Sequence, residues 1–168
     1  MSDRQSSAKP TAYERAVRLL AQRPHFRAEL AKKLAARGHQ RDEIDAALER
    51  CRAQGYLDDE AVARAFATER QERRGLGRAR VAADLRRRGA PAAATAAALG
   101  ATSDEDELVR AREAARKWRR KSAASGDPRA ALARHLDRKG FSRRAILAVL
   151  DEAGGAVSDD LAEAEPAD

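Results

Sequence analysis

The stretch RAELAKKLAARGHQRDEIDAAL at residues 27–48 recurs without a gap as RARVAADLRRRGAPAAATAAAL at 78–99 and as RAALARHLDRKGFSRRAILAVL at 129–150. Self-similarity at a fixed period is typical of repeat architectures, so the sequence predicts three copies of one structural unit. Seven positions hold the same residue in all three copies, at a spacing of 51 residues. Three of them are alanine, and the other four are Arg27, Arg78 and Arg129; Leu34, Leu85 and Leu136; Gly38, Gly89 and Gly140; and Leu48, Leu99 and Leu150.

Each copy reads as a helix, a glycine turn and a second helix. Apolar residues four apart, such as Leu30 and Leu34, mark one helix face. Basic residues followed by Gly38 are typical of a helix C-terminus, because cations complement the negative end of the helix dipole and glycine adopts the left-handed conformation without a Cβ clash. The second helix then begins, with Ser142 as N-cap in the third copy and Pro91 in the first helical turn of the second.

A further helix precedes each copy and covers its apolar stripe. We expect these helices at residues 11–22, 58–74 and 103–121. Asp58 is predicted to cap the middle one, and Thr102 with Glu105 to form a capping box for the last. The links between units are too short to separate them. The prediction is therefore an all-α protein of three tandem three-helix units in an elongated, curved row.

The composition agrees with a helical protein. The chain has 41 alanines but only eight valines and isoleucines, and alanine favours helices whereas β-branched residues favour strands. We expect the turns at 74–77 and 122–128 to be the loosest. The predicted organisation is a disordered N-terminal tail at 1–10, repeats at 11–55, 56–100 and 101–152, and an acidic disordered tail at 153–168.

Charge is distributed unevenly along the chain. The whole chain carries +7, but residues 151–168 hold seven acids and no base, so the remainder carries +14. Residues 69–88 hold eight bases and three acids, and residues 110–121 hold seven bases and one acid. Such density indicates an anionic partner, which is a nucleic acid, a membrane surface or an acidic protein face.

Several function classes are disfavoured. The chain has no apolar run of membrane-spanning length and no secretory signal pattern. A single cysteine, Cys51, falls on the apolar stripe of its helix, and the three histidines follow no zinc-ligand spacing. Asp58 and Asp59 are better explained as helix caps than as a metal pair, and no phosphate-binding loop pattern is present. We expect a cytoplasmic, monomeric, non-enzymatic protein with no membrane contact and no metal or cofactor.

The motif GYLDD at 55–59, followed by GLGRARVAADLRRRGAP at 75–91, within a basic three-unit helical chain, resembles the RecX family of regulatory proteins. The resemblance covers about residues 11–152. It implies a modulator, usually an inhibitor, of the RecA recombinase that docks along the groove of RecA filaments on single-stranded DNA. It also implies suppression of strand exchange, ATP hydrolysis and coprotease activity, and hence a place in DNA repair, recombination and the SOS response.

The arginine-rich segments are the predicted partner-binding surface, because guanidinium groups recognise carboxylate and phosphate alike. No catalytic constellation accompanies them. Tyr56 and Trp118 are either core residues or stacking platforms, and the sequence leaves both interpretations open. The predicted partner-binding residues are Arg70, Arg73, Arg74, Arg78, Arg80, Arg86, Arg87, Arg116, Lys117, Arg119, Arg120 and Lys121.

A second hypothesis is a free-standing, sequence-tolerant DNA-binding helical protein, since three-helix units with basic turns also describe tandem DNA-binding domains. Sequence-specific readout is disfavoured, because base edges are commonly read by asparagine and glutamine and the chain contains no asparagine. Weak, nonspecific DNA contact is compatible with both hypotheses. The chain departs from the RecX pattern at 91–99, where alanines dominate and Thr95 replaces the isoleucines of the other repeats, so this helix is predicted to pack weakly.

Overall fold

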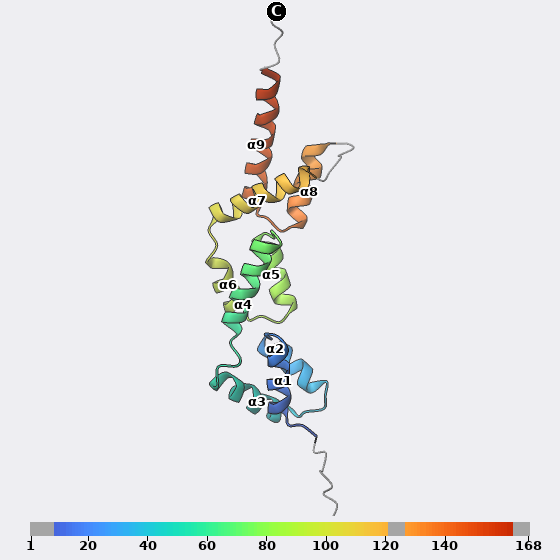
Figure 1. Cartoon of the computed structure of the whole chain (residues 1–168), viewed down its shortest axis with the longest axis vertical. Coiled ribbons are helices and arrows are strands. Elements are labelled where there is room, and N and C mark those ends of the chain that lie inside the picture. The colour runs from blue at the N-terminus through green and yellow to red at the C-terminus, as the bar shows by residue number, and fades with distance from the viewer. Residues whose placement is uncertain (1–8, 121–126, 163–168) are drawn as a thin grey trace, which may run out of the picture.

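The computed structural model describes residues 9–120 and 127–162, with side chains as far as Ala153. Within these ranges the secondary structure is entirely helical, with nine α-helices, one π-helical turn and no strand (Figure 1). The helices are α1 (Ala12–Gln22), α2 (Arg27–Ala35), α3 (Arg41–Ala53), α4 (Asp59–Thr68), the π-turn η1 (Glu69–Arg73), α5 (Arg78–Arg87), α6 (Ala92–Gly100), α7 (Asp104–Arg119), α8 (Pro128–Arg138) and α9 (Arg143–Ala162).

The helices form three units of three, stacked along the long axis of the molecule (Figure 1). In each unit the first and third helices pack most extensively against each other. Each unit has its own apolar cluster, built around the fully buried Leu34, Leu85 and Leu136. The predicted all-α repeat architecture is therefore confirmed. No helix in the described ranges is long and apolar enough to cross a membrane.

The glycine turns have the predicted backbone conformation. Gly38, Gly89 and Gly140 have φ values of +81°, +83° and +79°, which lie in the left-handed region that disfavours residues with a Cβ atom. The turns therefore end the second helix of every unit in the same way. The buried Cys51 is a core residue, as its position on the stripe predicts.

The predicted helix caps are correct at two places and wrong at a third. Asp58 accepts a hydrogen bond from Ala61 N at 2.9 Å, and Ser142 accepts one from Ala145 N at 3.3 Å. The capping box of α7, however, is made by Ser103 and Asp106 and not by the residue pair that begins at Thr102. Helix α7 starts one residue later than predicted because the Thr102 hydroxyl instead donates to Gln71 Oε1, 3.1 Å away in the second unit.

Three other helix boundaries differ from the prediction. Pro91 is the N-cap residue of α6 and precedes its first turn. The expected helix over 58–74 is α-helical only to Thr68 and continues as η1. Helix α9 runs to Ala162, whereas the sequence predicts a disordered tail from 153. Extending an established helix adds a hydrogen bond for each residue fixed, and no proline interrupts the chain before 166. Residues 163–168 and 1–8 of the predicted tails lie outside the described ranges.

The alanine-rich α6 packs more closely than expected. Ala94, Thr95 and Ala98 are all buried against the second unit, where the small side chains allow α6 to approach α4. The hydroxyl of Thr95 is buried and has no hydrogen-bond partner among the described residues. This is the energetic cost of placing threonine where the other repeats have isoleucine.

The two joints between units use the same device. Neither Phe26 nor Gly77, the residues before α2 and α5, caps its helix with a side chain. Instead the next unit supplies a carboxylate: Asp59 accepts from Arg27 N at 2.8 Å, and Glu107 accepts from Arg78 N at 3.1 Å. In the third unit Asp127 caps α8 from within the same unit, accepting from Arg129 N at 2.9 Å.

The second joint is also a close backbone contact. Gly77 N donates to Lys139 O at 2.9 Å, and Ala79 N donates to Gly140 O at 3.1 Å. A Cβ atom on Gly140 would lie 2.3 Å from Arg80 N, too close for any side chain. The turn at 74–77, predicted to be loose, is therefore packed between units. Of the other predicted loose turn, 121–126 lie outside the described residues.

The first joint is interlocked by an aromatic side chain. Phe26, which precedes α2 of the first unit, is fully buried in the cluster of the second unit with Val81 and Leu85. In return Leu57, at the start of the second predicted repeat, is buried in the first cluster. The first and second cores therefore depend on each other.

Replacing Gly140 with alanine tests the joint contact. We expect a loss of about 2–5 kcal/mol in the free energy of unfolding, because left-handed strain of roughly 1–2 kcal/mol adds to overpacking of roughly 1–3 kcal/mol. Gly55→Ala is the matched control, since Gly55 has a φ of +74° but a Cβ atom there would meet no other atom within 4 Å. Urea unfolding of both variants measures the difference, and equal losses would contradict the close contact.

Candidate partner-binding surface

Arg78, one of the predicted partner-binding residues, lies in the second joint. Its Nε and Nη2 atoms lie 3.3 and 3.1 Å from Glu107 Oε2, and Nη2 also contacts Asp104. The Glu107 side chain is 1% exposed. Arg78 therefore neutralises a buried carboxylate and holds α7 against α5. Because of this structural role we leave it out of the proposed surface.

The pairing explains the ionisation of Glu107. Burial acts to raise the pKa of this carboxyl, but hydrogen bonds from the backbone and side chain of Arg78 and from Ser142 outweigh it, so the pKa of Glu107 lies below its usual range. Hydrogen bonding to the charged form of an acid has this effect. Glu107 is therefore a carboxylate at neutral pH.

Five of the predicted residues are paired with acids. Glu69 and Glu113 are partly exposed, and exposed ion pairs contribute little to stability, whereas Asp84 is buried. The Arg70 guanidinium also lies over the ring of Phe66, 4.8 Å from its centroid. These pairs leave the basic groups accessible but partly neutralised. The pairs are Arg70 and Arg74 with Glu69 (3.4 and 3.2 Å), Arg80 and Arg87 with Asp84 (3.5 and 2.8 Å), and Lys117 with Glu113 (3.9 Å).

The other predicted partner-binding residues that the structure describes are exposed, and they have no ion-pair partner in the described part of the chain. They lie on the second and third units. Unpaired exposed arginines keep all their donors for an external anion. These residues are Arg73, Arg86, Arg116, Arg119 and Arg120; Lys121 lies outside the described residues.

Helix α7 divides its basic cluster between two faces. Arg116 and Arg119, three positions apart, line a cavity of about 310 Å³ between α7 and α9. Lys117 is rotated by about 100° from Arg116 on a helix and lines a different cavity, toward the second unit. The densest basic run of the sequence thus serves two surfaces.

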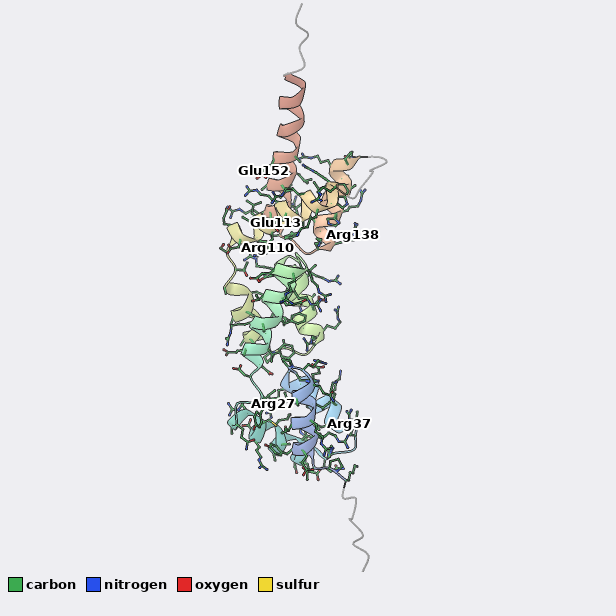
Figure 2. The ribbon with its side chains drawn as sticks, in the orientation of Figure 1. Arg27, Arg37, Arg110, Glu113, Arg138 and Glu152 are labelled. Carbon is green, nitrogen blue, oxygen red and sulfur yellow. The ribbon has the colours of Figure 1, made fainter. Side chains whose placement is uncertain are left out.

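The cavity toward the second unit is a cleft of about 280 Å³ at the second joint, which we call the joint cleft. It brings Arg73 and Arg74 from the end of η1 together with Lys117 from α7, so members of the two predicted clusters meet here. Figure 2 shows Arg110 and Glu113 at the level where the second and third units adjoin. The lining residues are Arg73, Arg74, Gly75, Arg110, Glu113, Ala114, Lys117, Trp118, His135 and Lys139.

Arg110, His135 and Lys139 were missed by sequence reasoning as members of this site. Arg110 lies four and seven positions before Ala114 and Lys117, a spacing that places all three on one helix face and that was available in the sequence. His135 and Lys139 come from α8 and its C-cap, and only the packing of the third unit brings them to η1. Trp118 packs against the third core and also lines the cleft, so its core role is confirmed and a role as a stacking platform stays a prediction.

The joint cleft is electrostatically unfavourable for its own cations. Burial, together with the charge of Lys117, lowers the pKa of the Lys139 ammonium. Burial and the charges of Lys139 and Arg138 lower the pKa of the His135 imidazole. Like charges and desolvation both disfavour the protonated form. An anion in the cleft would relieve both effects.

Comparison with known proteins points to one family. Two family models match the chain: "RecX, first three-helix domain" over residues 12–51 and "RecX, second three-helix domain" over 58–99. Regulatory protein RecX of Halorhodospira halophila is 38% identical over 151 residues, which cover 87% of this chain and 92% of that protein. Regulatory protein RecX of Geobacillus thermodenitrificans is 34% identical over 159 residues, which cover 91% of this chain and 58% of that longer protein.

The fold has a counterpart among solved structures. The crystal structure of RecX from Lactobacillus salivarius matches with a TM-score of 0.76 at 20% sequence identity. The match covers 84% of this chain and 93% of the other. All three units of the described fold therefore fall within a known helical architecture.

The Glu107–Arg78 pair predicts a specific pH dependence of stability. The pKa of Glu107 is lowered in the folded state. The Glu107 carboxylate therefore adds to the free energy of unfolding above its unfolded-state pKa of roughly 4.3. This stabilisation is lost as the pH falls through the lower pKa of the folded state. Glu107→Gln should lower the free energy of unfolding by about 1–3 kcal/mol at pH 7. The difference in free energy of unfolding between this variant and the parent should become smaller toward pH 3.

Denaturant unfolding between pH 3 and pH 7 measures this gap. Glu152→Gln is the matched control, since Glu152 is exposed and pairs with Arg112 at 2.7 Å. That variant should stay close to the parent at every pH. A Glu107→Gln variant that follows the control would show that the joint does not depend on this carboxylate.

Proposed function

The chain belongs to the RecX family of regulatory proteins, which are not enzymes, and from that premise we propose that it binds RecA and RecA filaments on single-stranded DNA. Binding inhibits the recombinase, ATPase and coprotease activities of RecA. The protein thereby regulates DNA repair and recombination in the cytoplasm, and it acts as a monomer.

The observation that carries this proposal is the distribution of exposed arginines that have no ion-pair partner among the described residues. Arg73 and Arg86 lie on the second unit, and Arg116, Arg119 and Arg120 lie on the third. An elongated protein with donors on successive units suits a filament groove, which presents phosphates and acidic side chains repeatedly along its length. The joints hold these units in a fixed order, so contacts on both units form together.

A second candidate function is free-standing, sequence-tolerant DNA binding. The same arginines favour it, because phosphate contacts position a protein on DNA without reading its sequence. The two functions differ in what they require of RecA. A DNA competitor acts in proportion to the DNA it covers, whereas a filament regulator acts at a small ratio to RecA.

The test is the single-strand-dependent ATPase of RecA with this protein titrated below the RecA concentration. We expect inhibition by the parent. Arg73→Glu with Arg86→Glu, and separately Arg116→Glu with Arg119→Glu, should each need a roughly tenfold higher concentration for the same inhibition, because desolvated arginines dominate many interfaces.

Arg41→Glu with Arg52→Glu is the control, since both residues are exposed on α3 of the first unit. This control should inhibit like the parent. All variants are compared at matched helicity and thermal midpoint. Inhibition that appears only when the DNA is saturated would favour the DNA-binding alternative, and full inhibition by both reversal variants would exclude the arginines as the binding surface.

A further inference from the structure

The two joints are built from equivalent residues but differ in charge. In the first joint Arg88 Nη2 lies 3.4 Å from Pro24 O and 3.5 Å from Glu29 Oε2. The residues 51 positions later are Lys139, Gly75 and Arg80. Lys139 Nζ repeats the carbonyl contact, donating to Gly75 O at 3.3 Å, but arginine replaces the acid.

The first joint neutralises its cations internally. Glu29 is bonded to Arg23 and lies 3.9 Å from His25 Nε2 as well as near Arg88. The Arg88 guanidinium also covers the rings of Phe26 and Phe66, at 5.4 and 5.0 Å from their centroids. Aromatic rings and a carboxylate therefore complete this joint.

The joint cleft of the second joint is neutralised less completely. Burial lowers the pKa of the Arg110 guanidinium and outweighs Asp106, Glu107 and Glu72, which act to raise it. Arg110 has two guanidinium atoms, Nε and Nη2, that are buried and have no hydrogen-bond partner among the described residues. Lys139 Nζ donates to Arg74 O and Gly75 O, which uses two of its three donors. The single acid of the lining, Glu113, is half exposed and pairs with Lys117 at 3.9 Å.

Burying cations without matching acid is costly, so an acceptor in the cleft would stabilise the cations that line it. The acceptor is anionic, because Arg73, Arg110, Lys117 and Lys139 converge from three elements of both units. A phosphate fits better than a carboxylate: it offers more acceptor oxygens and up to two charges, and arginine recognises it with paired donors. The cleft of about 280 Å³ also leaves room beside the Trp118 and His135 rings, 6.0 Å apart, for the organic part of a phosphate ester.

We propose that the joint cleft is a binding site for a phosphate group, held by Arg110, Arg73 and Lys139 between the second and third units. The phosphate comes either from a free nucleotide or inorganic phosphate, or from the backbone of a single-stranded nucleic acid. This site does not depend on the proposed regulation of RecA, because its occupancy is defined without RecA. A bound phosphate contacts both units and braces their joint.

The protein contains a reporter for this site. Trp118 is the only tryptophan of the chain and lines the cleft, so tryptophan fluorescence reports on the cleft and on the third core, against which Trp118 also packs. The probes are inorganic phosphate, deoxyadenosine monophosphate and an oligothymidylate, titrated at constant ionic strength set with chloride. Calorimetric titration of the same probes detects binding that leaves the fluorescence unchanged.

We expect saturable binding of at least one phosphate probe, and a rise in the thermal midpoint with its concentration, because a ligand specific to the folded state stabilises it. Arg73→Gln and Arg110→Met should each weaken binding roughly tenfold or more, as expected for loss of a charged hydrogen bond. Arg110→Met should unfold no more easily than the parent without phosphate, because it removes a buried cation whose Nε and Nη2 lack hydrogen-bond partners among the described residues.

Arg41→Gln is the control, since it removes the same charge from an exposed position on the first unit. It should bind like the parent. Tighter binding of the oligothymidylate than of the mononucleotide assigns the phosphate to a nucleic acid backbone, and equal binding assigns it to a free phosphate. The proposal is overturned if the parent binds none of the probes, if both cleft variants bind as the parent does, or if polyglutamate binds more tightly than every phosphate probe.

Discussion

The capping of one unit's helix by a carboxylate of the next unit is the interaction on which the rest of the structure depends. A helix N-terminus exposes backbone N–H groups that need acceptors, and α2 and α5 lack acceptors of their own. Asp59 and Glu107 supply them from across the joints. The three units are small and share core residues at the first joint, so each internal unit is completed by its neighbour.

This dependence determines what the basic residues can do. A charged side chain that bonds to a buried acid at a joint is used internally, as Arg78 is, whereas an exposed one, such as Arg73 in the joint cleft, remains available to a partner. The regular 51-residue period places the two joints at equivalent positions of the repeats. At the position of Glu29 in the first repeat, the second repeat has Arg80, which replaces a negative charge by a positive one at the second joint. Lys139 therefore lacks the acid that its counterpart Arg88 has in the first joint.

The repeat, the glycine turns and the core leucines were predictable because they follow from local rules: apolar spacing, left-handed glycine and capping. The start of α7 was not, since Thr102 is as good a cap as Ser103 until Gln71 of another unit engages its hydroxyl. Likewise, Arg78 and Arg73 belong to one basic run in the sequence, and only packing separates a joint residue from an exposed one. Charge density predicts the surface, but the three-dimensional contacts decide which of its charges are paired within the described part of the chain.

The central claim is that the second and third units, held in register by their joint, present one basic surface to the RecA filament. Amide hydrogen exchange of the full chain, with and without RecA filaments on single-stranded DNA, tests it most directly. We expect added protection over 69–87 and over 110–119 together, with α1 to α3 unchanged apart from the first joint. Protection confined to the first unit, or to only one of the two basic segments, would contradict it.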